Sequence, residues 1–128
     1  MAVINWLAVA AWAHLIYYFS SIPGFDIGLG LWDFAIRKSA HIFEFGYLAV
    51  LLYLAFGSVL KLRAEKIITL AAVCAFFYAV SDEFHQTFVT NRHGDPADVL
   101  IDSIGISLVI YLIIRKRGSR ERTAPKTG

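Results

Sequence analysis

The sequence predicts an all-α, polytopic membrane protein built as a bundle of four transmembrane helices. Hydrophobic residues make up 58% of the 128-residue chain and charged residues 17%, whereas soluble domains average about 45–50% and 25%. Four apolar runs, at residues 2–22, 40–60, 67–88 and 97–114, approach or reach the roughly 20 residues that a helix needs to cross the hydrocarbon layer. We therefore expect one transmembrane domain over residues 1–117.

The first helix is expected from about Val3 to Phe19. No basic residue precedes its apolar stretch, which is also long, so the pattern favours a retained helix over a cleaved signal peptide. Pro23 and Gly24 end the helix, because proline cannot continue it and Pro-Gly is a turn signal. Residues 25–36 are too short and too broken by glycines to span, and we expect them to lie in the headgroup zone.

The second helix is expected to begin near Arg37. Its polar residues Lys38, His41 and Glu44 are spaced three apart, so they share one face of its first two turns. The rest of this helix is almost entirely apolar. The polar face is therefore confined to one end of the span.

The third helix ends in the stretch Ser81–Phe88, which places Asp82, Glu83 and His85 within four positions. A charged side chain at the centre of a bilayer helix costs ~2.5–3.5 kcal/mol on insertion scales. Such groups persist where they face a protein interior, lie near an interface or carry a function. We expect them near the membrane interface, at the far end of the helix.

The fourth helix is preceded by a polar loop. Asp95 is the expected N-cap, Pro96 suits the first helical position, and Asp98 follows in the first turn. The helix is expected to end at Arg115–Arg117. Residues 118–128 are polar and basic, and we expect a disordered cytoplasmic tail.

The charge distribution predicts that both termini are cytoplasmic. Basic residues concentrate on the side of the termini, where the positive-inside rule places the cytoplasm; they are Lys61, Arg63, Lys66, Arg115, Lys116, Arg117, Arg120, Arg122 and Lys126. The other side carries most of the acids and only three basic residues, Arg37, Lys38 and Arg92. The basic side fits anionic lipid headgroups, and no nucleic-acid partner is needed to explain it.

Polar side chains from three helices are expected to meet at the outer face. We expect catalytic groups among His85, Glu83, Asp82, His41 and Glu44, and substrate-binding groups among Lys38, Arg92, Gln86 and Asp98. In this hypothesis His85 handles protons, Asp82 or Glu83 orients it, and Lys38 and Arg92 hold an anionic headgroup or balance the acids.

Three interpretations of this set stay open. In a structural one, the basic residues pair with carboxylates, and Asp95 and Asp98 cap the fourth helix. In the second, His and carboxylate side chains bind a divalent metal, although no strict metal-binding motif is present. In the third, the site handles a lipid-linked phosphate, although the surplus of acids disfavours phosphate binding without a metal.

Three motifs in order resemble those of the VanZ-like membrane protein family, named for a glycopeptide (teicoplanin) resistance protein. They are Tyr18–Gly24, Lys38–Leu48, and Ser81–Phe88 followed by Arg92, Asp98 and Gly105. The chain departs from the family pattern at Thr90-Asn91, where Pro-Gly is frequent, and at Asp102, where Asn is frequent.

The resemblance implies a multi-pass protein of the bacterial cytoplasmic membrane that acts in the cell envelope, with a link to teicoplanin resistance. A membrane-embedded hydrolase or transferase acting on a lipid-linked phosphate or another envelope lipid is the alternative. The expected partners are membrane lipids and a lipid-linked cell-wall intermediate or glycopeptide. Small residues such as Gly46 and Gly105 fit packing within one bundle as well as a weak homodimer.

Overall fold

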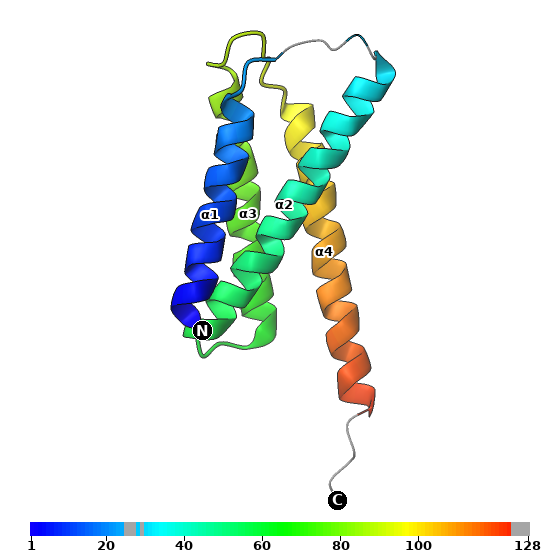
Figure 1. Cartoon of the computed structure of the whole chain (residues 1–128). Helices are drawn as coiled ribbons and strands as arrows, with labels where there is room; N and C mark the ends of the chain where they lie inside the picture. The colour runs from blue at the N-terminus through cyan, green and yellow to red at the C-terminus, as the bar shows by residue number, and fades with distance from the viewer. Residues whose placement is uncertain (25–27, 29, 124–128) are drawn as a thin grey trace, which may run out of the picture.

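The computed structural model describes residues 1–24, 28 and 30–123, which form four α-helices. In chain order these are α1 (Ala2–Ser21), α2 (Leu31–Val59), α3 (Ala64–Gln86) and α4 (Pro96–Thr123), and no strand occurs in the described part of the chain (Figure 1). Each helix contains a stretch long and apolar enough to cross a membrane. The prediction of an all-helical membrane bundle is confirmed.

The second helix begins earlier than the sequence predicts. It starts at Leu31 rather than near Arg37, so the second half of the segment assigned to the headgroup zone, residues 31–36, belongs to α2. Gly30 precedes the helix at φ 53°, a left-handed conformation that glycine adopts readily. No helix breaker follows Gly30, which explains the early start. The remaining residues of that segment, 25–27 and 29, lie outside the described residues.

The fourth helix continues further than predicted. It extends through Thr123, so residues 118–123 are helical and the expectation of a disordered tail is wrong there. Lys and Arg are good helix formers, and a single glycine such as Gly118 costs only about 1 kcal/mol relative to alanine. Residues 124–128 lie outside the described part.

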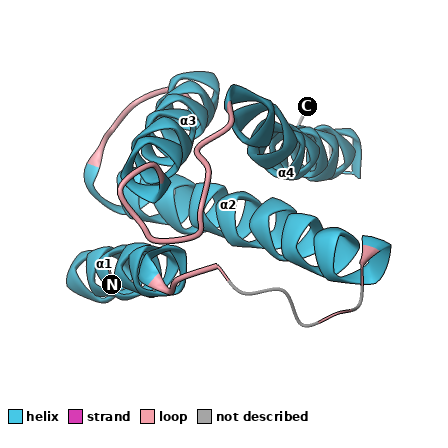
Figure 2. Cartoon of the chain, turned by 90° about the horizontal axis from the view of Figure 1, so that it is seen from above, coloured by secondary structure: helices cyan, strands magenta, loops and turns pink. Residues whose placement is uncertain are grey.

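Helix α2 is the central element of the bundle. Viewed from above, it lies between α1 on one side and α3 with α4 on the other (Figure 2). Hydrogen bonds near the middle of α1 hold it to its neighbours: the Trp12 indole donates to the carbonyl of Glu44 on α2 at 3.0 Å, and the Tyr78 hydroxyl of α3 donates to the carbonyl of Ala13 at 2.6 Å. Both bonds satisfy polar groups that could not form hydrogen bonds with the hydrocarbon chains of the lipid.

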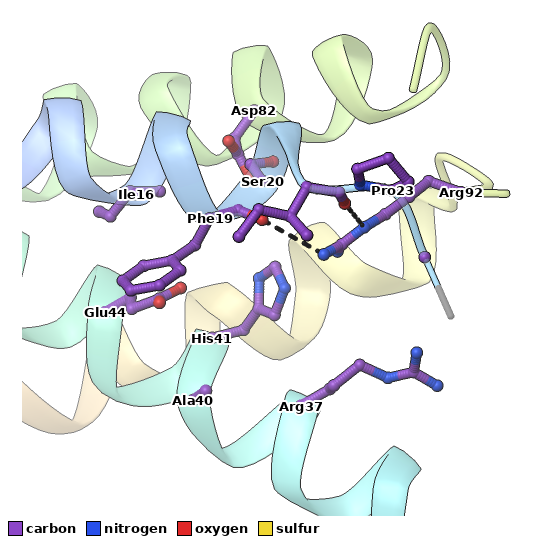
Figure 3. A pocket seen from close by; sticks show the side chains of 12 residues that line it. Ile16, Phe19, Ser20, Pro23, Arg37, Ala40, His41, Glu44, Asp82 and Arg92 are labelled. Carbon is purple, nitrogen blue, oxygen red and sulfur yellow. Dashed lines mark hydrogen bonds between the residues drawn. The ribbon is translucent and has the colours of Figure 1, made fainter. Parts of the chain in front are cut away.

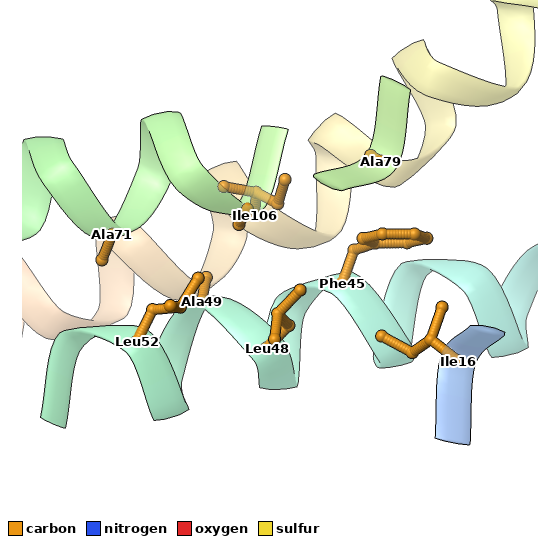
Figure 4. Close-up of a cluster of buried hydrophobic side chains, with 9 residues drawn as sticks. Ile16, Phe45, Leu48, Ala49, Leu52, Ala71, Ala79 and Ile106 are labelled. Atoms are coloured by element: carbon orange, nitrogen blue, oxygen red, sulfur yellow. The ribbon is translucent and has the colours of Figure 1, made fainter. Parts of the chain in front are cut away.

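The buried core follows the inner face of α2. Phe45, Leu48 and Ala49 are almost fully enclosed, and they meet small residues of α3 and larger ones of α1 and α4 (Figure 4). The α3 side of this contact is a row of alanines four apart in sequence. Small side chains at that spacing allow two helices to approach closely. The members of the core are Ile16, Phe45, Leu48, Ala49, Leu52, Ala71, Ala75, Ala79 and Ile106.

Helices α2 and α4 cross at two glycines. A Cβ atom on Gly105 would overlap the backbone carbonyl of Ile42, and one on Gly46 would lie 3.1 Å from the carbonyl oxygen of Gly105. The backbones therefore touch without intervening side chains. Past this crossing the two helices diverge toward the end of the bundle that holds the N-terminus (Figure 1).

We predict that Gly105→Ala destabilises the bundle. The added methyl group forces α2 and α4 apart, and overpacking of this kind typically costs about 1–3 kcal/mol. Thermal unfolding of the detergent-solubilised protein, followed by circular dichroism, measures the loss.

Gly57→Ala on α2 is the matched control, because a Cβ atom there meets nothing within 4 Å. It should unfold at or slightly above the temperature of the unmodified protein. Equal stability of the Gly105 and Gly57 variants would show that the crossing tolerates a side chain.

Candidate functional site

A cavity of about 410 Å³ opens between the end of α1 and residues 37–44 of α2 (Figure 3). The apolar part of its lining comes from α1 and the segment after it, with Ile16, Phe19, Ile22 and Pro23. The ionisable part comes from the other elements; its members are Arg37, His41, Glu44, Asp82 and Arg92. The cavity is thus apolar on one side and rich in ionisable groups elsewhere.

Arg92 fastens the loop before α4 to the end of α1. Its Nε donates to the carbonyl of Ile22 at 3.1 Å, Nη2 donates to the carbonyl of Phe19 at 3.3 Å, and Nη1 donates to Gln86 Oε1 at 3.4 Å. Carbonyls at a helix C-terminus lack intrahelical donors and carry the negative end of the helix dipole. Arg92 was predicted to bind substrate. In the structure, at least three of its N–H groups already donate hydrogen bonds within the protein, so it anchors the loop.

The loop that carries Arg92 packs tightly on the turn after α1. The Gly24 amide donates to the carbonyl of Thr90 at 3.2 Å, and a Cβ atom on Gly24 would overlap the carbonyl of Asn91. Asn91 has a φ of 57°, in the left-handed region that asparagine enters more readily than most residues. This chain has Thr90-Asn91 where Pro-Gly is frequent in the family, and Asn91, like the glycine it replaces, can adopt this conformation.

Asp82 is linked to Arg92 through Gln86. The Gln86 amide nitrogen donates to Asp82 Oδ2 at 2.9 Å, while its oxygen accepts from Arg92. Asp82 and Gln86 are both buried, with 5% and 3% of their surface exposed. A buried carboxylate is costly without a hydrogen-bond partner, so this chain of bonds stabilises Asp82 in the lining of the cavity.

Glu83 faces the loop rather than the cavity. Its Oε1 accepts a hydrogen bond from the backbone amide of Asp95 at 2.7 Å, just before α4 begins. Gly94 lies close by, where a Cβ atom would meet the carbonyl of Glu83 at 2.7 Å. Glu83 was predicted as a catalytic candidate, and the structure gives it a role in anchoring this loop.

His85 points toward α1. Its Nε2 lies 3.0 Å from Ser21 Oγ, and that hydroxyl donates its one proton to the carbonyl of Tyr17 at 2.6 Å. The hydroxyl therefore accepts from Nε2–H, and the imidazole also packs against the Tyr17 ring with centroids 4.6 Å apart. The prediction that Asp82 or Glu83 orients His85 is wrong, because His85 bonds to Ser21 of α1, whereas Asp82 bonds to Gln86 and Glu83 to the loop before α4.

His41 pairs with Asp102 instead. Its Nδ1 lies 3.4 Å from Asp102 Oδ1, and Asp102 is 1% exposed. Within the described residues neither carboxylate oxygen of Asp102 accepts a hydrogen bond. The ring also stacks on Phe45 and projects into the cavity (Figure 3). A carboxylate behind a histidine at a cavity is the arrangement of a general base.

Lys38 forms an ion pair with Asp98 of α4, and its ammonium lies 5.3 Å from the centre of the Phe34 ring. Both charged side chains are about four-fifths buried and lie outside the cavity lining. This pairing is the one that the structural interpretation predicts. Lys38 and Asp98 therefore tie α2 to α4 near the cavity.

The cavity collects only part of the predicted site. It includes His41, Glu44, Asp82 and Arg92 with Gln86 behind them, and it leaves out His85, Glu83, Lys38 and Asp98. No group of three or more His, Cys, Asp or Glu side chains among the described residues is arranged to hold a metal ion. The described side chains therefore do not form a site for a divalent metal.

Sequence reasoning missed the contribution of α1, of Arg37 and of Asp102. Ser20 lines the cavity with 4% of its surface exposed, and its hydroxyl has no hydrogen-bond partner in the described part of the chain. Ser20 belongs to the motif Tyr18–Gly24 at the end of the first helix, so that motif was the sequence feature that pointed to it. For Asp102, the signal was its four-residue spacing from Asp98 on the helix face that also holds Gly105.

Comparison with known proteins places the chain in a family. The family model described as VanZ/LLP1 matches residues 3–117, which contain almost all of the four helices. No curated protein and no solved structure matches the chain.

We predict that Arg92→Lys destabilises the end of α1. Lysine keeps the charge but lacks the planar fork that reaches three acceptors at once. Loss of hydrogen bonds made by a charged group should lower the free energy of unfolding by about 1.5–3 kcal/mol. Denaturant unfolding in detergent checks this, with the exposed Arg63→Lys as control. Two variants of equal stability would contradict the anchoring role.

Proposed function

Because the chain belongs to the VanZ/LLP1 family and forms a multi-pass membrane protein, we propose that it acts in the bacterial cell envelope by binding an amphipathic envelope molecule in the cavity. We further propose that it resides in the cytoplasmic membrane, with the cavity on the extracytoplasmic side. Its activity is linked to resistance to glycopeptides of the teicoplanin type. The expected ligands are a lipid-linked cell-wall intermediate, another envelope lipid or the glycopeptide itself.

The single observation that carries the proposal is the mixed lining of the cavity. Ile16, Phe19 and Pro23 offer an apolar surface to a hydrocarbon segment, while His41 and Glu44 offer polar partners to its headgroup. Ligand sites typically combine a mainly apolar lining with a few convergent polar groups. The Ser20 hydroxyl is a further polar group of the lining, and it forms no hydrogen bond with any described residue.

The placement on the extracytoplasmic side rests on charge. The opposite end of the bundle carries Lys61, Arg63 and Lys66 between α2 and α3, together with the basic last turns of α4. The positive-inside rule assigns such an end to the cytoplasm. The cavity then opens toward the leaflet where cell-wall intermediates are used.

We predict that Glu44→Gln removes the resistance phenotype. The Glu44 carboxylate lines the cavity and accepts no hydrogen bond from the described residues, so its replacement alters the ligand site with little effect on the fold. In a teicoplanin-susceptible bacterium, the unmodified protein should raise the minimal inhibitory concentration and the variant should return it to the empty-vector value.

Glu65→Gln serves as the matched control, because Glu65 is exposed at the opposite end of α3. It should keep the phenotype at equal membrane abundance. An unmodified protein that leaves teicoplanin susceptibility unchanged would remove the link to resistance. Full resistance with Glu44→Gln would instead contradict a role of the cavity in resistance.

The pair of His41 and Asp102 favours a second function, that of a hydrolase or transferase acting on a lipid-linked phosphate or another envelope lipid. Asp102 Oδ1 lies 3.4 Å from Nδ1 of His41, and His41 lines the cavity whereas Asp102 does not. His41 then accepts the proton of a water or alcohol as its oxygen attacks the phosphorus of the headgroup. The bond from phosphorus to the leaving oxygen breaks, and His41 returns the proton to that oxygen. This assigns to His41 the proton-handling role that the sequence assigned to His85.

We predict that His41→Gln removes such an activity. Loss of a general base typically lowers turnover about 10²–10⁴-fold. The purified protein in vesicles, incubated with a lipid-linked pyrophosphate or a phospholipid, should release a headgroup product detectable by mass spectrometry. His85→Gln should retain turnover, because His85 lies outside the cavity and bonds to Ser21.

The exposed His93→Gln, in the loop at the same end, is the matched control. Equal loss from His85→Gln and His41→Gln would contradict the assignment to His41. No product from the unmodified protein with either lipid would leave binding as the better-supported function.

A further inference from the structure

A second cavity, which we call the basic groove, lies at the other end of the bundle. It has a volume of about 440 Å³ and is lined by residues of α2 and α4 only. Its members are Val50, Tyr53, Leu54, Ile113, Lys116, Arg117 and Arg120. None of them belongs to the predicted site, and none lines the cavity described above.

The crossing of α2 and α4 explains why the groove exists. The two helices touch at Gly46 and Gly105 and separate toward this end (Figure 1). The basic groove lies between the separated parts of α2 and α4. Tyr53 and Ile113 are half buried there, and Leu54 is exposed. An apolar slot therefore runs down from the end of the bundle toward its middle.

Three basic side chains stand at the mouth of this slot. Lys116, Arg117 and Arg120 follow one another along the last turns of α4, and the lining contains no acidic residue. Arg117 Nη1 donates to the hydroxyl of Tyr53 at 3.3 Å, which directs the guanidinium across the groove toward α2. Concentrated positive charge above an apolar slot is complementary to a phosphate attached to hydrocarbon chains.

The position along the helix matches the level of lipid phosphates. The membrane-length stretch of α4 is Pro96–Arg120, so Lys116, Arg117 and Arg120 occupy its last turns. Ile113 lies one turn deeper, and Val50 and Leu54 face it from α2. When the phosphate of a lipid contacts the three basic side chains, its acyl chain can pack against these apolar residues.

We propose that the basic groove binds one anionic phospholipid of the surrounding leaflet. The phosphate contacts Lys116, Arg117 and Arg120, and one acyl chain fills the slot between α2 and α4. This site is separate from the proposed function, because it lies at the opposite end of the helices and shares no residue with the other cavity. The bound lipid bridges two helices that diverge from a single point of contact, and thereby stabilises their angle.

The test is native mass spectrometry of the full-length protein in detergent, titrated with phosphatidylglycerol or with phosphatidylcholine of the same acyl chains. The unmodified protein should retain one phosphatidylglycerol at concentrations where no phosphatidylcholine is bound. The triple variant K116Q/R117Q/R120Q should bind phosphatidylglycerol roughly a hundredfold more weakly, because each basic residue near the membrane surface contributes substantially to attraction of anionic lipid.

The matched control is K61Q/R63Q/K66Q, which removes three exposed positive charges from the same end but outside the groove. Its affinity should stay within about threefold of the unmodified protein, because these exposed side chains do not line the groove and salt screens their charges. An equal loss in both triple variants would overturn the proposal, since it would indicate attraction by overall charge.

Two further measurements distinguish a specific lipid site from nonspecific attachment of phosphate to basic side chains. Inorganic phosphate at equal concentration should leave the phosphatidylglycerol bound; its displacement would show that the apolar slot contributes nothing, and would overturn the proposal. Circular dichroism checks the fold of each variant. A folded groove variant that binds phosphatidylglycerol as the unmodified protein does would also overturn it.

Discussion

The close crossing of α2 and α4 positions most other features of this protein. The carbonyl of Ile42 lies so near Gly105 that a side chain there would overlap it. On the cavity side of this contact, the same two helices bring His41 to Asp102 and Lys38 to Asp98. On the opposite side they diverge, which leaves the basic groove open. In a membrane, where the hydrophobic effect does not drive helix association, contact of this kind through small residues is an effective way to fix an angle.

A second constraint is the cost of burying charge. Asp82, Glu83 and Asp102 are almost fully enclosed, yet their partners differ in kind. Asp82 is stabilised by a chain of hydrogen bonds that leads to Arg92, and Glu83 by a backbone amide. Among the described residues, Asp102 has only a histidine as its partner. A buried carboxylate with so little compensation is expensive to retain for stability alone, and this cost supports the second function proposed for the pair of His41 and Asp102.

The elements of the fold were largely predictable, and the errors have local causes. Four apolar runs predicted four helices, because length and hydropathy are sufficient to recognise a membrane span. Helix ends were harder. Residues 31–36 looked too irregular and residues 118–123 too polar, yet both continue a helix already nucleated by its neighbours. Extending a helix adds one hydrogen bond for each residue fixed, whereas starting one is unfavourable.

The sequence by itself determined the number of helices, the concentration of polar residues at one end and the charge difference between the two ends. These depend on composition and on spacing along one helix. Only the tertiary structure decided which polar residues meet. Asp82 and His85 lie three positions apart on α3, so their directions around the helix differ by about 60°. This difference is enough for His85 to meet Ser21 of α1 while Asp82 lines the cavity. Which histidine meets a carboxylate depends on how separate helices are placed against one another. For α2 and α4, the backbone contact at Gly46 and Gly105 sets the angle that brings His41 to Asp102.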